Sequence, residues 1–275
     1  MNRGEGSEKN FVKYSALGND YIVIDPLKST LGCDEEIVKY ICDRNNGPGS
    51  DGVLYGPTSK ECLTLRIFNP DGTECEKSGN GIRIFSNYLY DNGYIKDSSF
   101  NIDLNGESIL VTPVIPSQGI FRVRLGKATP GLLNSSEYPF VGREMTFDGK
   151  SFIGSFIDIG NPHLVLETTN ISADMAKHFG PIASNYDIFP NRTNVQFCRV
   201  VDYSNIEIQI YERGAGYTLA SGSSSCAVVA ALYMQKKVGS RVSVIMPGGE
   251  LSVEIDENEN IHLEGPSRYI YSGKL

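Results

Sequence analysis

Two serine–glycine pairs, Ser78-Gly79 and Ser221-Gly222, are the residues whose type and spacing most directly suggest chemistry. In each copy a polar residue, Asn69 or Glu212, ends a strand-like run nine positions before the serine (78 − 69 = 221 − 212 = 9). The two serines are 221 − 78 = 143 residues apart. Two similar halves that each present a serine to a shared ligand would suit removal and return of a proton at a stereocentre.

A second echo supports the repeat, because Gly18-Asn19 recurs as Gly160-Asn161 at an offset of 160 − 18 = 142. Each serine is expected at the start of a helix, where unpaired N–H groups and partial positive charge favour a substrate carboxylate. A single Ser-Gly before a helix is more often only a cap. Two such pairs at the repeat offset, each after a matched strand, favour the functional interpretation.

Length and composition indicate a two-domain cytoplasmic protein, since 275 residues allow one core in each half. We place the domains at 1–129 and 130–266, with a C-terminal strand at 267–275 that returns to the first. A net charge of −8 argues against nucleic acid and anionic membranes as partners. No membrane-spanning run or signal-peptide core is present in the sequence. The histidines and cysteines lack zinc spacing, so no metal site is predicted.

Strand patterns dominate the chain and predict an α+β protein. The alternation at 62–68 and the β-branched run at 21–24 are typical of strands. Helices are predicted at 34–43, 79–90 and 223–237, and no more than one turn is expected near Ser184. Further strands are expected at 100–104, 107–114, 120–125, 152–158, 163–167, 194–200, 206–211, 242–246, 250–255 and 261–264.

Other polar residues gain significance only through their positions beside strands. Asn19, Asn69, Asn161 and Asn194 each adjoin a strand, although such an asparagine is more often a turn residue than a ligand contact. Arg213 lies in a glycine-rich turn and could bind a carboxylate with both arms of its guanidinium, or simply pair with Glu212 at the surface.

Taken together, these segments resemble the diaminopimelate epimerases, cofactor-independent amino-acid racemases and epimerases, over nearly the whole length. The resemblance implies two pseudo-symmetric domains, each a strongly curved, mainly antiparallel sheet around a central helix. The segments that carry it are Leu17-Gly-Asn-Asp20, Gly49-Ser-Asp-Gly52, Phe68-Asn-Pro-Asp-Gly72, Ser78-Gly-Asn-Gly-Ile-Arg83, Gly160-Asn-Pro-His163, Asn194-Val-Gln-Phe197, and Tyr211-Glu-Arg-Gly-Ala-Gly216 through Ser221-Gly-Ser223.

One departure from the family concerns its two proton-transferring cysteines, whose positions are held here by Ser78 and Ser221. In the family one thiolate removes the α-proton and the other thiol protonates the opposite face. A thiol at a helix N-terminus can ionise near neutral pH, whereas a serine hydroxyl is a far weaker acid. The sequence alone leaves open whether the serines are engineered or natural, and we expect slow or absent epimerisation.

The resemblance also implies roles for the residues that hold the substrate. Asn69, Asn161, Asn194 and Arg213 would bind the distal amino-acid end of diaminopimelate. The reacting end would be held by Asn19, Gly79, Asn80, Gly222 and Ser223. His163 and Glu212 would lie near the catalytic positions and assist as proton acceptors.

These assignments imply the isomerisation of L,L- to meso-diaminopimelate in lysine and peptidoglycan synthesis. No metal, pyridoxal phosphate or nucleotide is required, because no dinucleotide fingerprint or phosphate loop is present in the sequence. The partner is the small-molecule amino acid, and a homodimer is one open arrangement. Two alternatives remain: a diverged racemase or isomerase of another amino acid, and an inactive amino-acid-binding homologue.

Overall fold

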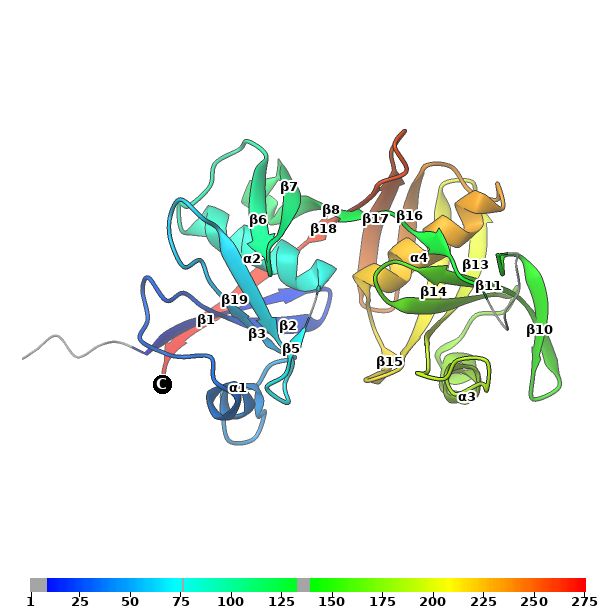
Figure 1. The fold of residues 1–275 in the computed structure, drawn as a ribbon, viewed down its shortest axis with the longest axis horizontal. Coiled ribbons are helices and arrows are strands. Elements are labelled where there is room, and N and C mark those ends of the chain that lie inside the picture. The colour runs from blue at the N-terminus through cyan, green and yellow to red at the C-terminus, as the bar shows by residue number, and fades with distance from the viewer. Residues whose placement is uncertain (1–8, 76, 133–138) are drawn as a thin grey trace, which may run out of the picture. The chain divides into compact units, whose positions relative to one another are not determined.

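The computed structural model describes residues 9–75, 77–132 and 139–275 and divides the chain into two compact units (Figure 1). Unit 1 runs to Val123 and includes Gly265–Leu275, and unit 2 is Arg124–Glu264. The division falls inside strand β8 (Ile120–Gly126), a few residues before the boundary at 129/130 that was expected from the sequence. The last strand, β19 (Arg268–Lys274), pairs antiparallel with β1 and so completes unit 1.

Unit 1 contains two helices and a mainly antiparallel set of strands. Its parallel pairs are β2–β3 and β4–β6. The helices are α1 (Glu35–Cys42) and α2 (Gly79–Asp91), and a short 3₁₀ turn spans Pro116–Gln118. Besides β8 and β19, the strands are β1 (Asn10–Ala16), β2 (Asn19–Ile24), β3 (Val53–Tyr55), β4 (Thr64–Phe68), β5 (Glu74–Cys75), β6 (Phe100–Leu104) and β7 (Glu107–Ile115).

Unit 2 has the same kinds of elements, and its parallel pairs are β12–β13 and β14–β16. Its helices are α3 (Ala173–Ser184) and α4 (Gly222–Met234). Its strands are β9 (Thr129–Pro130), β10 (Arg143–Phe147), β11 (Lys150–Asp158), β12 (Pro162–Glu167), β13 (Asn194–Asp202), β14 (Asn205–Glu212), β15 (Gly216–Thr218), β16 (Arg241–Met246), β17 (Gly249–Ile255) and β18 (Ile261–Pro266).

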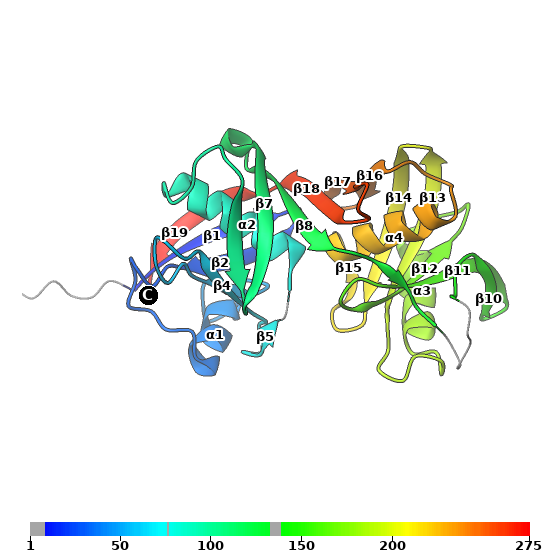
Figure 2. The same ribbon diagram turned by 45° about the horizontal axis from the view of Figure 1, so that its top comes forward.

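The two units repeat one order of elements. In unit 1 the order is β2, α1, β3, β4, β5, α2, β6, β7, and in unit 2 it is β12, α3, β13, β14, β15, α4, β16, β17. The strand pairings match in direction as well. In each unit the first strand of this run pairs parallel with the second, and the third pairs parallel with the fifth. The predicted α+β class and the repeat are therefore confirmed (Figure 2).

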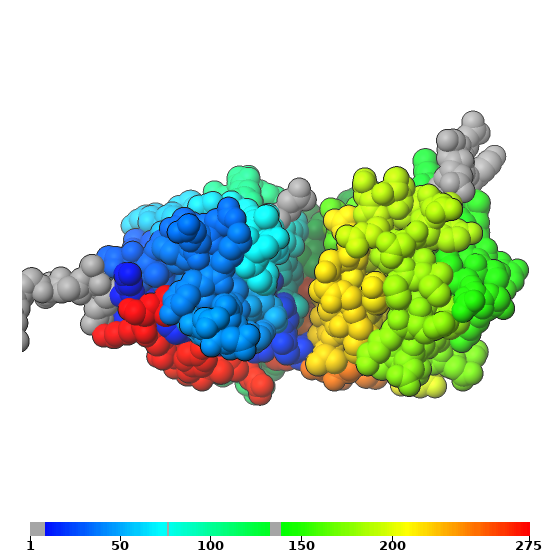
Figure 3. All heavy atoms as spheres, turned by 90° about the horizontal axis from the view of Figure 1, so that it is seen from below, coloured from blue at the N-terminus to red at the C-terminus, as the bar shows by residue number. Residues whose placement is uncertain are grey.

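The helices that follow the two serines are the enclosed helix of each unit. Ten residues of α2 and ten of α4 are buried. An almost wholly apolar helix such as α4 is stable only when other elements surround it, and α4 packs on strands that include β11, β12, β13 and β17 (Figure 1). By contrast, α1 is amphipathic, begins at the Asp34 cap and, like α3, lies at the surface of its unit (Figure 3).

Helix α3 differs from the expectation of no more than one turn near Ser184. The helix begins after the Ser172 cap, whose hydroxyl accepts from the Met175 N–H at 3.1 Å, and ends at Ser184. Gly180 and Pro181 are residue types that disfavour a helix interior. Gly180 is required because a Cβ there would lie 2.5 Å from the Tyr211 ring, so close packing explains a residue that reads as a helix breaker.

The predicted strands from residue 100 onward all occur, with ends that shift by no more than two residues. Among the described residues, no helix is both long and apolar enough to span a bilayer.

Candidate functional site

Ser78 is the N-cap of α2, as expected. Its Oγ accepts a hydrogen bond from the Gly81 N–H at 3.1 Å and lies 3.4 Å from the Tyr21 hydroxyl. The side-chain cap therefore uses one acceptor position of the serine that is proposed for chemistry. The N–H groups of Gly79 and Asn80 precede the capped one and lie in the first turn, where the helix dipole favours an anion.

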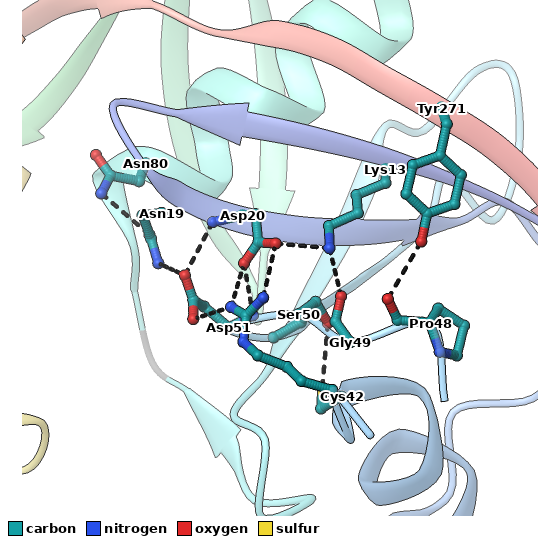
Figure 4. A network of polar contacts seen from close by, with 12 residues as sticks. Lys13, Asn19, Asp20, Cys42, Pro48, Gly49, Ser50, Asp51, Asn80 and Tyr271 are labelled. Carbon is teal, nitrogen blue, oxygen red and sulfur yellow. Dashed lines mark hydrogen bonds and ion pairs between the residues drawn. The ribbon is translucent and has the colours of Figure 1, made fainter. Parts of the chain in front are cut away.

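Asn80 and Asn19 are joined to each other in unit 1 (Figure 4). Asn80 Nδ2 donates to Asn19 Oδ1 at 3.1 Å, and Asn19 Nδ2 donates to Asp51 Oδ2 at 3.1 Å. Arg83, fully buried in α2, donates to Asn80 Oδ1 at 2.9 Å. Two of the residues predicted to hold the reacting end of a ligand are thus fixed in one chain of hydrogen bonds.

Charged side chains hold the far end of this chain. Arg44 binds both Asp20 and Asp51 at 2.7 Å, and Lys13, which is 8% exposed, pairs with Asp20 at 2.7 Å (Figure 4). Burial alone would raise the pKa of Asp20, but hydrogen bonds from Arg44 and Lys13 lower this pKa to about 2. Asp20 is therefore ionised at neutral pH. The Asn19–Asn80 pair is supported by a charged cluster, which consists of Lys13, Asp20, Arg44 and Asp51.

Asn69 lies just after β4 and is exposed. Its Nδ2 donates to Thr73 Oγ1 at 3.0 Å, and its carbonyl accepts from the Gly72 N–H at 3.0 Å. The asparagine thus closes a turn within the FNPDG segment. Among the described residues its side chain makes no hydrogen bond to Asn19 or Asn80, so the exposure of Asn69 is what leaves it open to a ligand.

Ser221 is the N-cap of α4 and is 5% exposed. Unlike Ser78, it makes no side-chain capping hydrogen bond in the part of the chain that the structure describes. Its carbonyl accepts from the Ser225 N–H at 3.1 Å and from the Ser225 hydroxyl at 2.8 Å. The first-turn N–H groups, which include those of Gly222 and Ser223, are thus not capped by the serine side chain.

His163 was predicted to assist as a proton acceptor, but its surroundings differ from that role. The imidazole is fully buried, its Nε2 lies 2.9 Å from Asn161 Oδ1, and its Nδ1 lies 3.0 Å from Gln196 Nε2. Burial lowers the pKa of His163 to about 3, the Gln196 hydrogen bond opposes this, and the Arg213 charge adds to the lowering. With both nitrogens engaged, the neutral ring positions Asn161 and offers no lone pair to a ligand.

Asn194 connects the segment that carries Asn161 and His163 to Arg213 through backbone groups. Its Nδ2 donates to the Pro162 carbonyl at 3.0 Å, and its Oδ1 accepts from the Arg213 N–H at 3.2 Å. Asn194 therefore fixes the segment that carries Asn161 to the turn that carries Arg213. The structure thus brings Asn161, His163, Asn194 and Arg213 together in unit 2.

Arg213 and Glu212 follow each other at the end of β14. Arg213 is exposed, and among the described residues its guanidinium forms no ion pair. Glu212 is partly exposed and pairs with Gly216 across the β14–β15 hairpin. An exposed guanidinium with a fixed backbone is suited to binding a carboxylate of a ligand.

Several residues that support these sites were not singled out from the sequence, among them Arg44, Asp51, Gln196 and Ser224. Asp51 lies in the quoted Gly49-Ser-Asp-Gly52 segment, which could have indicated its importance. Gln196 likewise lies in the quoted Asn194-Val-Gln-Phe197 segment, as the polar residue between Val195 and Phe197. Within the described ranges, no cluster of three or more histidine, cysteine or acidic residues is arranged to hold a metal ion.

Comparison with known proteins shows one family. The model of the family described as diaminopimelate epimerase matches residues 11–130 and 155–270. Diaminopimelate epimerase 2 of Nostoc sp. is 42% identical over 274 residues, which cover 96% of this chain and 95% of that protein. The diaminopimelate epimerase of Methanococcus maripaludis is 32% identical over 273 residues, 96% of this chain and 99% of that one.

Solved structures show likeness in fold. The crystal structure of a PhzF-family phenazine biosynthesis protein from Bacillus anthracis superposes with a TM-score of 0.70 at 15% identity, over 97% of this chain and 98% of that one. At that identity the likeness concerns the fold alone.

Proposed function

Because the chain belongs to the diaminopimelate epimerase family, we propose that it binds diaminopimelate and interconverts its L,L and meso forms. The reaction would remove a proton from one α-carbon and return a proton to the opposite face, without a cofactor. The observation that carries this proposal is 42% identity to a diaminopimelate epimerase over 96% of the chain. The hydrogen-bonded asparagines of both units add support.

We assign the distal end of the ligand to residues of unit 2 together with Asn69. Arg213 would bind the distal carboxylate with its two guanidinium arms, while Asn161 and Asn194 complete the site. The support is the arrangement described above, in which Asn194 ties the Asn161 segment to the Arg213 backbone.

We assign the reacting end to the two helix N-termini. Backbone N–H groups at Gly79 and Gly222 would bind the α-carboxylate, with Asn19, Asn80 and Ser223 as further contacts. Positive potential at these N-termini would also stabilise negative charge that develops when the α-proton leaves. Support comes from the caps at Ser78 and Ser221, which begin the two matched helices.

Proton transfer is where this chain should differ from its family. Ser78 and Ser221 occupy the positions that, by resemblance, hold the two thiols. A serine hydroxyl is not ionised near neutral pH, so the proposed epimerisation is slow. By resemblance, Glu212 would be the acid–base group that remains near the second serine, whereas His163 has both nitrogens engaged.

A second candidate function is that of a binding protein for the same amino acid. The observation that favours it is the hydrogen bond from the Gly81 N–H to Ser78 Oγ, which holds this oxygen as a helix cap. A capped hydroxyl is a poor base, yet the N–H groups and asparagines that would bind the ligand are intact.

Deuterium exchange separates the two candidates. The native chain is incubated with L,L- and with meso-diaminopimelate in D₂O, and α-deuterium and stereochemistry are followed by NMR and chiral chromatography. Slow α-deuterium uptake with inversion supports the epimerase, and binding by calorimetry without any uptake supports the binding protein. Absence of both binding and uptake would refute the proposed function, and thermal stabilisation by a panel of amino acids would then identify another ligand.

A further inference from the structure

A buried chain of hydrogen bonds in unit 2 ends at a residue of the proposed site. Gln196 Nε2 lies 3.0 Å from Ser224 Oγ and 3.0 Å from His163 Nδ1, and His163 Nε2 lies 2.9 Å from Asn161 Oδ1. Ser224, Gln196 and His163 are each 0% exposed, whereas Asn161 is partly exposed. The chain therefore leads from the interior of the first turn of α4 to the one member that a ligand can reach.

The chain has a direction because an amide nitrogen can only donate. Gln196 Nε2 uses its two N–H bonds on Ser224 Oγ and His163 Nδ1, so Nδ1 must be the unprotonated nitrogen of the ring. The ring proton then lies on Nε2 and is donated to Asn161 Oδ1. Gln196 Oε1 is buried without a hydrogen-bond partner, so the two bonds of Nε2 are the hydrogen bonds that orient the amide among the described residues.

We propose that Gln196 is a positioning residue that fixes His163 as the neutral Nε2–H tautomer and thereby turns the Asn161 amide nitrogen toward the ligand. The two ends of the Asn161 amide differ, because Oδ1 is taken by His163 and Nδ2 remains to donate. Asn161 held in this way offers its Nδ2 as a hydrogen-bond donor, so it favours a ligand group that accepts. In an amino-acid ligand, the carboxylate is such an acceptor. The donation from Asn161 to a ligand carboxylate rests on the proposed function, whereas the direction of the hydrogen bonds does not.

The direction of the chain can be measured in the unliganded protein by ¹⁵N NMR of the imidazole nitrogens. The His163 signals are assigned by their loss in His163→Gln. We expect the proton on Nε2 throughout the range from pH 5 to pH 8. A proton on Nδ1 in the native chain would overturn the inference, because Gln196 would then accept rather than donate.

Two substitutions of Gln196 test its role, and a matched glutamine serves as the control. Gln196→Glu places an acceptor beside Nδ1, so the ring should become protonated there. Gln196→Met keeps the length but removes the donor, so the tautomer should no longer be fixed. Gln209→Met removes a glutamine from the neighbouring strand β14 that accepts from the Tyr217 hydroxyl at 2.7 Å, and it should leave the tautomer unchanged.

Ligand affinity separates positioning from general support of the fold. Calorimetry with diaminopimelate should show at least tenfold weaker binding for Gln196→Glu and Gln196→Met at native thermal stability, and native affinity for Gln209→Met. An unchanged tautomer and affinity in both Gln196 variants would overturn the inference. If the native chain does not bind diaminopimelate but the proton moves in Gln196→Glu, the proposed function fails and the role of Gln196 stands.

Discussion

Unit 1 and unit 2 each contain a helix N-terminus of the same kind, but different interactions orient the asparagine that accompanies it. In unit 1, the Asn19–Asn80 pair rests on ion pairs among Lys13, Asp20, Arg44 and Asp51, some of which touch solvent. In unit 2, Asn161 rests on a neutral and fully buried chain through His163 and Gln196. The element order fixes where the asparagine stands, while the chemistry that orients it differs between the units.

The two serines differ in the same manner. Ser78 Oγ caps its own helix by accepting from Gly81, whereas Ser221 makes no such bond in the described residues. The cap on α2 contributes to stability and engages the Ser78 oxygen, whereas α4 lacks a side-chain cap and leaves the Ser221 oxygen out of any capping bond. We therefore expect substitutions in the two units to have unequal effects, which the following experiments measure.

The largest effect is expected from restoring sulfur at both serines. The double change Ser78→Cys with Ser221→Cys should raise the rate of epimerisation by about 10²–10⁴-fold, the contribution that a positioned acid and base supply. Either single change should recover little inversion, because the two groups act as a unit.

The single variants sharpen the comparison of the units. Ser78→Cys should also lose about 0.5–2 kcal/mol of stability through its weakened cap, whereas Ser221→Cys should lose less. Rates are followed by chiral chromatography for the four combinations, and stability by urea unfolding. An inactive double-cysteine protein that still binds diaminopimelate would contradict the thiol argument.

The second effect concerns Arg213 in unit 2. Arg213→Ala should weaken diaminopimelate binding by about 2–4 kcal/mol, since one partner of a charge pair is lost. Arg213→Lys keeps the charge but not the two parallel donors and should give an intermediate loss. Calorimetry measures both, with the exposed Arg192→Ala as control, and an unchanged affinity would make Arg213 a structural residue only.

Acid should weaken unit 2 before unit 1. The native pKa of His163, about 3, lies below the unfolded value of 6.5, so between these values the unfolded chain binds more protons. The free energy of unfolding should then fall by about 1.4 kcal/mol per pH unit at most as the pH drops below 6.5. Asp20 has a native pKa of about 2, against 3.8 in the unfolded chain. Its contribution to the free energy of unfolding is therefore lost only below about pH 3.8.

Urea unfolding from pH 7 to pH 4 measures this slope, and hydrogen exchange locates it. Amides of β13 should lose protection at a higher pH than those of β2. His163→Gln should flatten the slope in this range, and an equal slope in native and variant proteins would contradict the assignment.

The smallest effect on ligand binding is expected from a substitution in the charged cluster of unit 1. Asp51→Asn keeps the shape but removes the charge that Arg44 binds, so Asn19 becomes less well oriented. We expect ligand binding to weaken by roughly 1 kcal/mol. Asp103→Asn, which alters the Gly106 N–H bond in the β6–β7 hairpin, is the matched control. Equal affinities for the two variants would show that the ion pairs do not position Asn19.

Much of the fold could be predicted because its strands alternate in hydrophobicity. Strand β6 occurs with the ends predicted for it, and α2 begins at the predicted Gly79, directly after the Ser78 cap. Strand β1 was not predicted, since Lys13 interrupts the apolar pattern. The lysine is buried because Asp20 neutralises it, and a pairing between residues on different strands leaves no local pattern.

The site was predictable only as far as its residues belong to recognisable segments. Asn19, Asn80 and Asn161 were found through their motifs. The buried orientation of His163 depends on Gln196 and Ser224, which come from β13 and α4 and meet only in the folded unit. Because these residues come together only in the folded unit, no spacing in the sequence reveals how His163 is oriented.

The most direct test of the proposed function, with Asn19 and Arg213 as ligand-binding residues, is a calorimetric titration with meso-diaminopimelate. The account predicts one ligand per chain, with affinity lowered both by Asn19→Ala in unit 1 and by Arg213→Ala in unit 2. Two independent ligands per chain, or an affinity that responds to only one of these substitutions, would contradict it.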